Sequence, residues 1–277
     1  MWTSENRTRY SRAGLRYPSD LTDEEWAEIA PLIPPARRGG RRRRVDVRAV
    51  LDGILYVLES GCQWRHLPKD LPPRSTCHDY LQLWAWDGTL ERIHYQLYQR
   101  AREHEGREAS PSAAVVDSQS VRSASKGACA DPVGYDAGKK VKGVKYQILV
   151  DTLGLMLNIV VHPADIQDRD GAALVLDKRT RQTFPFIEIV YADGGYQGDK
   201  AANAVAAVGT WQLAIVKRSD RAKGFVVIPK RWVVERTLSW LSRCRRLVRN
   251  HELYHRTAVA FIRLAMIRLM LRRVCAQ

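Results

Sequence analysis

The spacing of apolar residues predicts helices through the first hundred residues. Residues 47–60 carry an apolar side chain every three or four positions, which places these side chains on one face of a helix that Gly61 would end. An earlier helix is expected to stop at Pro34, with three candidate N-cap residues: Ser19, Asp20 and Thr22. A third helix is expected within residues 73–88, with three side chains facing inward: Tyr80, Leu83 and Trp84.

The pattern changes after residues 103–112, where apolar residues become scarce and Gly, Ser and Pro appear. A β-branched run begins at residue 113 and is expected to form a strand that ends at Asp117. Two further runs flank a tight turn at residues 152–154, which predicts a pair of antiparallel strands. Later strands alternate with helices, so the second half is predicted to be a mixed α/β sheet.

These patterns divide the chain into four parts. We expect an all-α N-terminal module over residues 1–105, a linker over 106–112, an α/β domain over 113–250 and a C-terminal helix within 251–277. Several short helices beside an arginine-rich loop are typical of helix-turn-helix-like DNA-binding modules. A purely structural helical cap would show the same pattern, because helix count alone says little about binding.

Composition describes a soluble globular protein, with 45% hydrophobic and 27% charged residues among 277. The polar opening lacks the apolar segment of a signal peptide. Arg263 and Arg268 interrupt the apolar C-terminal stretch, which argues against a membrane span. Five scattered cysteines fit reduced thiols better than a disulfide framework. We therefore expect a cytoplasmic protein that does not bind membranes.

The net charge of +15 is concentrated near the C-terminus. Residues 219–277 hold 14 Lys and Arg against 3 Asp and Glu, so they carry +11 of the total. A basic surface kept only for solubility would be spread more evenly along the chain. A concentrated positive charge indicates a polyanionic partner, most simply nucleic acid.

Three carboxylates stand out against this basic background. Asp117 and Asp193 are each expected at a strand end, where ligands collect in open α/β sheets. Two glycines follow Asp193; a turn would account for them, and so would a metal ligand that needs space beside it for a large anionic substrate. Glu235 lies on a predicted helix, outside its buried stripe. Three carboxylates suit two Mg²⁺ ions that catalyse phosphoryl transfer.

The motifs of the chain resemble those of a known family. In the N-terminal part they are "LTDEEW", "DGILY" and "GCQWRHLP", and in the α/β part "DSQSV", "GYDAGKKVKG", "DTLG", "QDRDGA", "YADGGYQG" and "RWVVERT". In these motifs the chain is similar to bacterial DDE transposases of the insertion-sequence family five group. The resemblance implies a ribonuclease-H-like catalytic core whose catalytic and metal-binding acids are Asp117, Asp193 and Glu235.

The resemblance also implies an activity. Such an enzyme binds the terminal inverted repeats of an insertion sequence, cleaves phosphodiester bonds to free 3′-hydroxyls and joins these to target DNA. We expect two Mg²⁺ ions, replaceable by Mn²⁺, double-stranded DNA as partner, a homodimer and a location at the bacterial nucleoid. A DNA-binding repressor, an inactive derivative of the same fold, or a nuclease without strand transfer remain alternatives.

Several basic residues are expected to contact DNA phosphates. The family often places Tyr and Lys on the helix of the third acid, where this chain has Ile228 and Ser242. The phosphate contacts of that helix are therefore assigned to neighbouring arginines. The full predicted set is Arg41, Arg42, Arg43, Arg44, Lys139, Lys140, Lys142, Arg231, Arg236 and Arg243.

Three other clusters suggest alternative chemistry. "HELYH" at residues 251–255 matches a zinc-protease pattern that requires both imidazoles on one helix face. Four residues could bind zinc in the helical module, although their spacing fits no standard finger: Cys62, His66, Cys77 and His78. Helix-start capping accounts for a further acidic cluster, one member of which could instead lie near a metal site: Asp165, Asp168 and Asp170.

Overall fold

The computed structural model describes the chain in segments that form two compact units. The described residues are 3–4, 10–36, 39, 43–124, 130–209, 211–216 and 232–275. The helical unit comprises Met1–Gly106, Arg243–Leu247 and Ala260–Gln277, and the sheet unit comprises Arg107–Ser242 and Val248–Val259. The C-terminal segment, which the sequence pattern set apart as one helix, is thus divided between the two units.

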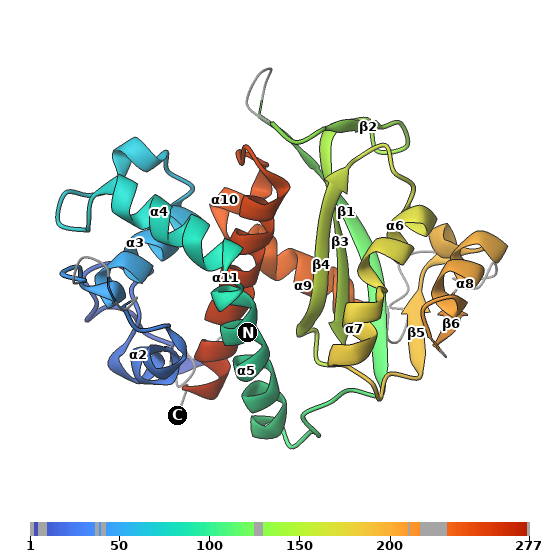
Figure 1. Ribbon diagram of the computed structural model, residues 1–277, viewed down its shortest axis with the longest axis horizontal. Coiled ribbons are helices and arrows are strands. Elements are labelled where there is room, and N and C mark those ends of the chain that lie inside the picture. Colours follow the sequence, from blue (N-terminus) through green and yellow to red (C-terminus); the bar gives the residue numbers. More distant parts are fainter. Residues whose placement is uncertain are drawn as a thin grey trace. The chain divides into compact units, whose positions relative to one another are not determined.

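The helical unit contains the helices expected in the first hundred residues (Figure 1). Their bounds are α2 (Asp23–Ile29), η1 (Ala30–Leu32), α3 (Val47–Ser60), η2 (Trp64–His66), α4 (Arg74–Trp86) and α5 (Thr89–His104). Most of α10 (Arg245–Val248) and the greater part of α11 (His255–Val274) complete it. The N-terminal part of the chain is therefore helical, as predicted.

Local signals explain where these helices begin and end. Thr22 caps α2 in a capping box with Glu25, which selects one of the three predicted N-caps. Gly61 ends α3 with a φ of 69°, a left-handed conformation that glycine adopts without strain. The inward face of α4 is partly different from the predicted one: Trp84 is buried, but Leu83 is exposed. Cys77 and Leu81 take the inward positions, because they lie on the same helix face as Trp84.

Helix α11 supplies part of the core of the helical unit. From Ala260 onward its apolar residues are buried on all sides of the helix, as in Phe261, Leu264 and Met270. A helix that is apolar all round belongs in a protein interior. Its interrupting cation Arg268 pairs with Glu59 of α3. Its apolar residues are therefore buried within the chain itself. None of the described helices combines the length and hydropathy that a membrane crossing needs.

The sheet unit is a mixed α/β structure, as predicted. Six strands of the described residues form one sheet: β1 (Ala113–Arg122), β2 (Gly134–Asp136), β3 (Val141–Asp151), β4 (Met156–Pro163), β5 (Ile189–Ala192) and β6 (Gln212–Ile215). Strand β3 pairs antiparallel with β1, β2 and β4. Strand β5 pairs parallel with β1 and β6. The predicted hairpin turn is present between β3 and β4, where Gly154 has a φ of 77°.

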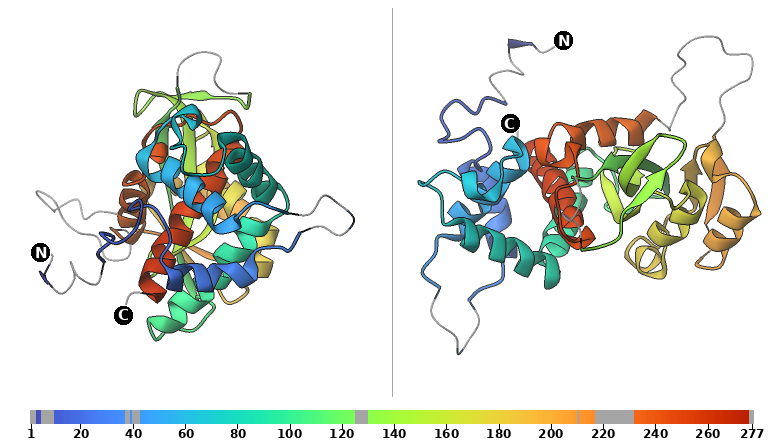
Figure 2. Two further views of the ribbon diagram at one scale, coloured as in Figure 1. Left: turned by 90° about the vertical axis from the view of Figure 1, so that its left-hand side faces the viewer. Right: turned by 90° about the horizontal axis from the view of Figure 1, so that it is seen from above.

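Helices cover both faces of this sheet. The remaining elements are α6 (Asp168–Val175), α7 (Lys178–Thr183), η3 (Gly194–Tyr196), α8 (Asp199–Ala206) and α9 (Trp232–Ser242). Helix α6 packs on β1, β3 and β4, while α9 packs on β1 and β3. Figures 1 and 2 show α6 and α9 on opposite faces of the sheet. Strand β1 is thus enclosed between two helices, so the polar side chains along it need hydrogen-bond partners.

A buried aspartate makes the stability of the helical unit depend on pH. Asp52 lies in α3, is 5% exposed and accepts a hydrogen bond from the Leu21 amide. Burial raises the pKa of Asp52 to about 6, above the value of about 3.9 expected in the unfolded chain. The stability associated with this group is thus fully present below about pH 4 and is lost as pH rises through about 6.

We predict that Asp52→Asn stabilises the helical unit at pH 7.5 by about 1–3 kcal/mol and has little effect at pH 4. The amide oxygen can still accept the bond from Leu21, without a charge to bury. Denaturant unfolding at both pH values measures this difference. Asp79→Asn, at an exposed position of α4, is the matched control. An equal effect of Asp52→Asn at both pH values would contradict the prediction.

Candidate active site

Strand register brings two of the predicted acids together. The parallel pairing of β1 with β5 ends at Val115 and Tyr191. Asp117 and Asp193 each follow two residues later, so they leave the paired region side by side on strands about 4.8 Å apart. The predicted strand end at Asp117 is wrong, because β1 continues to Arg122 along β3. Asp117 lies instead where the neighbouring parallel strand stops.

The two glycines after Asp193 form a turn and also leave space. The carboxylate Oδ1 of Asp193 accepts a hydrogen bond of 2.8 Å from the Gly195 amide, which orients it at the start of η3. A Cβ atom at Gly195 would lie 3.0 Å from this Oδ1 and 3.6 Å from Oδ2 of Asp168, whereas a Cβ at Gly194 would meet open space. Gly195 therefore keeps the space between two carboxylates clear.

Tyr196 is buried close to Asp117, Asp168 and Asp193. Its ring is fully buried, and its hydroxyl oxygen accepts a hydrogen bond of 2.5 Å from Nε2 of Gln147. Burial, followed by the negative charges of Asp117, Asp168 and Asp193, raises the pKa of Tyr196 well above its ordinary value. Its hydroxyl is therefore protonated at neutral pH, and three carboxylates lie close enough to influence it.

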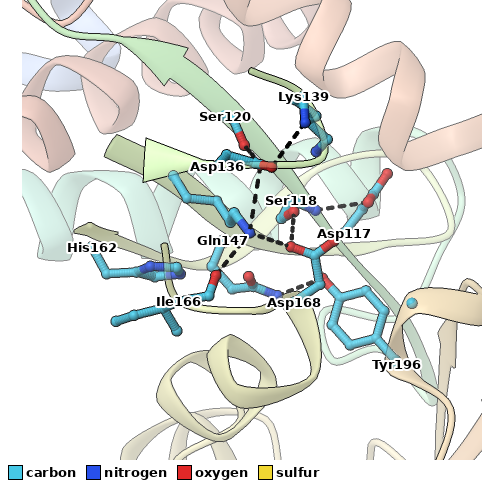
Figure 3. A network of polar contacts seen from close by, with 12 residues as sticks. Asp117, Ser118, Ser120, Asp136, Lys139, Gln147, His162, Ile166, Asp168 and Tyr196 are labelled. Atoms are coloured by element: carbon cyan, nitrogen blue, oxygen red, sulfur yellow. Dashed lines mark hydrogen bonds and ion pairs between the residues drawn. The ribbon is translucent and has the colours of Figure 1, made fainter. Parts of the chain in front are cut away.

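Asp168 is held by the strands on which α6 packs (Figure 3). Its Oδ1 accepts hydrogen bonds of 2.7 Å from both Ser118 Oγ and Lys145 Nζ, and Lys145 also donates to the Ile166 carbonyl at 2.8 Å. Burial tends to raise the pKa of Asp168, but the Lys145 and Ser118 bonds outweigh it and lower that pKa. Helix-start capping alone therefore does not account for Asp168, because its hydrogen-bond partners lie on β1 and β3.

The same lysine approaches a second carboxylate. Lys145 is 4% exposed, and its Nζ lies 3.9 Å from Oδ2 of Asp136 on β2. Asp136 also accepts hydrogen bonds from Ser120 Oγ and from the Lys139 amide. Burial again opposes these contacts, which nevertheless lower the pKa of Asp136. The network joins β1, β2, β3 and α6 around one buried positive charge (Figure 3).

Helix α9 is anchored to the hairpin turn between β3 and β4. The Arg236 guanidinium lies 4.3 Å from the ring centre of Trp232 and 4.6 Å from that of Trp240. Its Nη2 donates to the Leu153 carbonyl at 2.9 Å. The bond to Leu153 joins α9 to the sheet, while both tryptophans lie on α9 itself and hold the guanidinium in place. The DNA contact predicted for Arg236 stays a prediction beside this anchoring role.

Glu235 is exposed in the first turn of α9. Side chains alternate along a strand, so Asp117 points to the face opposite that of Ser118, which is the face that α9 covers. Within the described part of the chain, however, no three His, Cys, Asp or Glu residues lie close enough to hold a metal ion. The structure thus brings Asp117 and Asp193 together and does not place Glu235 with them as a third ligand.

The predicted DNA contacts are mostly surface cations. Lys139 and Lys140 lie in the turn after β2, and Lys142 lies on β3; all three are exposed, as are Arg44 and Arg243. Arg43 donates to the Pro34 carbonyl. Three members of the set fall outside the described residues: Arg41, Arg42 and Arg231.

The alternative metal sites do not form. Residues 251–254 precede α11, so the two histidines of "HELYH" do not share a helix face. His255 instead contacts the Pro132 carbonyl through Nε2. Cys77 is buried in α4. The four predicted zinc ligands of the helical unit, all of them among the described residues, form no group that could bind a metal ion.

Two protein-family models match the chain. The model described as "Transposase DDE domain" matches residues 108–270, more than half of the chain. This chain belongs to the DDE transposase family. A second model, described as a putative transposase of the IS4/5 family, matches residues 21–94. The matches confirm the resemblance inferred from the sequence motifs. Members of this family are transposition enzymes that act on DNA, and DDE domains generally use divalent metal ions.

Curated relatives support the same family. The chain is 36% identical over 113 residues to an uncharacterized 16.2 kDa protein of insertion element IS402 from Burkholderia cepacia, covering 39% of this chain and 76% of that protein. It is 30% identical over 111 residues to a putative transposase for IS402 from the same organism, covering 38% of this chain and 52% of that protein. An uncharacterized protein of Sinorhizobium fredii, y4sN, is 30% identical over 73 residues, covering 26% of this chain and 58% of that protein. No solved structure matches the chain significantly.

The buried polar residues of β1 and β3 carry a sequence signal of their own. Lys145 and Gln147 interrupt the apolar run of β3 at every second position, and Ser118 and Ser120 do the same in β1. In a strand, this spacing places polar groups on one face. Polar groups in a covered strand need partners. Such a pattern therefore predicts a buried polar network, although not its members.

We predict that Gly195→Ala weakens divalent-cation binding by about tenfold. This is the lower end of the loss in metal affinity that follows when the groups orienting the metal ligands are disturbed. The added methyl would enter the space between the Asp193 and Asp168 carboxylates and displace the former. Titration of Mn²⁺, followed by the electron paramagnetic resonance signal of the free ion, measures the affinity. Gly194→Ala is the matched control, since its methyl meets open space. Equal affinities of the two variants would show that this space does not matter.

Proposed function

We propose that this chain is the transposase of an insertion sequence that cleaves phosphodiester bonds at the element's ends and joins the freed 3′-hydroxyls to target DNA. Asp117, Asp193 and Glu235 hold two Mg²⁺ ions, which Mn²⁺ can replace. The observation that carries this proposal is the strand register that sets Asp117 beside Asp193, within the region that matches the DDE domain.

The carboxylate pair suits a divalent cation. Mg²⁺ prefers oxygen ligands, keeps several waters and is commonly bound through one or two carboxylates together with substrate phosphates. Both aspartates are half-exposed, and the space beside Gly194 is open. Glu235 is proposed as the third ligand because it is exposed on the helix that covers the face toward which Asp117 points.

Each group then has a chemical role. Bound ions supply activation of a water or 3′-hydroxyl and stabilisation of the leaving oxygen. Asp117 and Asp193 fix the position at which this chemistry occurs. Tyr196 stays neutral beneath them, so it adds no negative charge that would repel a phosphate. The anchoring of α9 by Arg236 limits the movement of Glu235.

The sheet supports a ribonuclease-H-like assignment of the catalytic core. Strands β1, β3 and β4 pair antiparallel in succession, and β5 and β6 continue the sheet in parallel on the other side of β1. The acids then stand on the central strand β1 and just beyond its parallel neighbour. This arrangement is the one that the family resemblance implies.

Double-stranded DNA is the proposed partner. The helical unit recognises the terminal inverted repeats, while exposed cations such as Lys142 and Arg243 neutralise phosphates of the repeats and of the target. Cutting both ends of an element in register requires two active sites, so we propose a homodimer. The enzyme would act at the bacterial nucleoid, where its DNA substrate lies.

We predict that Asp117→Asn, Asp193→Asn and Glu235→Gln each reduce DNA nicking by at least about a hundredfold, because metal ions contribute several kcal/mol to this chemistry. DNA binding should remain mostly intact, since the basic surfaces are unchanged. Incubation with Mg²⁺ and labelled DNA carrying the element's ends measures nicking. Asp199→Asn, an exposed acid at the start of α8, is the control.

The same assay separates the proposal from its alternatives. Nicking followed by joined products supports a transposase. Nicking without joining indicates a nuclease that lacks strand transfer, and binding alone indicates a repressor or inactive derivative. Near-normal nicking in any one of the three variants would remove that residue from the site.

We also predict that DNA affinity falls steeply with salt, because phosphate contacts release counterions. Lys142→Gln should lower the slope of log affinity against log salt by about one. Lys178→Gln, at an exposed position of α7 outside the predicted set, should leave the slope unchanged. Affinity measured by fluorescence anisotropy from 50 to 300 mM salt (roughly the range over which such slopes are read) tests both. A DNA affinity that does not change with salt would show that contacts between basic residues and phosphates do not drive binding.

A further inference from the structure

A carboxylate that the proposed function does not use, that of Asp168, lies near Asp193. Asp168 accepts two hydrogen bonds at Oδ1, from Ser118 and Lys145. Its Oδ2 accepts no hydrogen bond from any residue that the structure describes. Figure 3 shows Asp168 close to Ser118, between Asp117 and the ring of Tyr196. One oxygen of this carboxylate is therefore fixed and the other is available.

The fixed oxygen is held firmly. Lys145 is buried, and burying its charge is costly unless that charge is paired and hydrogen-bonded. Its amino group is tied to Asp168 and to the Ile166 carbonyl, and it lies near Asp136. Because a carboxylate is planar and rigid, fixing Oδ1 through two donors also limits where Oδ2 can point.

The available oxygen faces the space beside Asp193. Oδ1 of Asp193 and Oδ2 of Asp168 both lie within 3.6 Å of the point where a Cβ of Gly195 would stand. The absence of a side chain at Gly195 thus leaves a gap that two carboxylates from different elements border. An acid that served only to neutralise Lys145 would not need its second oxygen at this gap.

We propose that Asp168 is a positioning residue of the active site, which accepts through Oδ2 a hydrogen bond from a water molecule bound to the catalytic cation. This inference rests on the proposed function, because it requires a cation at Asp117 and Asp193. Groups that orient the ligands of a metal ion commonly change its affinity by 10- to 100-fold when they are lost. A purely structural partner of Lys145 would have no such effect once the lysine charge was also removed.

The test uses a single and a double variant of the full chain. Asp168→Asn alone leaves the buried Lys145 charge without its carboxylate, so thermal stability is expected to fall. Lys145→Met combined with Asp168→Asn removes both charges, so stability is expected to recover. Mn²⁺ affinity is measured without DNA, from the electron paramagnetic resonance signal of the free ion. We expect both variants to bind Mn²⁺ about tenfold more weakly than the unaltered chain.

Asp199→Asn is the matched control. Asp168 and Asp199 each occupy the first position of an eight-residue helix in the sheet unit, and either substitution removes one negative charge. The control is expected to bind Mn²⁺ as the unaltered chain does. If the methionine pair does not fold, Lys145→Gln with Asp168→Asn replaces it, because its two amides can hydrogen-bond to each other.

Asp117→Asn separates failure of this inference from failure of the proposed function. If Asp117→Asn weakens Mn²⁺ binding while the double variant regains both stability and full Mn²⁺ affinity, Asp168 is only a structural partner and the inference is overturned. If Asp117→Asn leaves Mn²⁺ affinity unchanged, the cation site itself is overturned, and the inference with it. Recovered stability with persistently weak Mn²⁺ binding is the expected result.

Discussion

The parallel pairing of β1 with β5 runs through three residue pairs and stops where the chain turns at Gly194, while β1 continues along β3. Among the residues that the structure describes, none pairs with this edge of β1 immediately beyond Val115. Asp117 occupies that edge, and Asp193 stands beside it at the end of β5. Two carboxylates on neighbouring strands can bind one divalent cation together.

The buried polar network behind the site maintains this geometry. Lys145 carries a positive charge in the layer between the sheet and α6, and the carboxylates of Asp136 and Asp168 balance it. Breaking such a buried pair on one side costs about 3–5 kcal/mol, so the network strongly fixes the place of α6 on the sheet. Beside this network, Gln147 of β3 donates a hydrogen bond to the Tyr196 hydroxyl. Ionic and hydrogen-bonded contacts therefore stabilise the site together with apolar packing.

Much of the fold was predictable because its signals are local. The glycine that ends α3, the hairpin turn before β4 and the mixed sheet all follow from short patterns of residue types. Other features depend on contacts that no local pattern encodes. The extent of β1 beyond Asp117 is set by its antiparallel partner, and the burial of α11 from Ala260 in the helical unit joins segments far apart in the sequence. The partners of Asp168 lie 23 and 50 residues away, on two strands. The motifs could thus predict candidate acids, but not the residues that hold Asp168.

The motif resemblance and the strand register point to the same pair of aspartates, which lies within the region that matches the DDE domain. The central claim is that this pair binds the catalytic cation. A crystal structure of the full chain soaked in Mn²⁺, with anomalous diffraction to locate the ion, tests it most directly. The account predicts an anomalous peak in direct contact with carboxylate oxygens of both Asp117 and Asp193. A fully occupied Mn²⁺ site elsewhere, with these two carboxylates in contact with no ion, would contradict it.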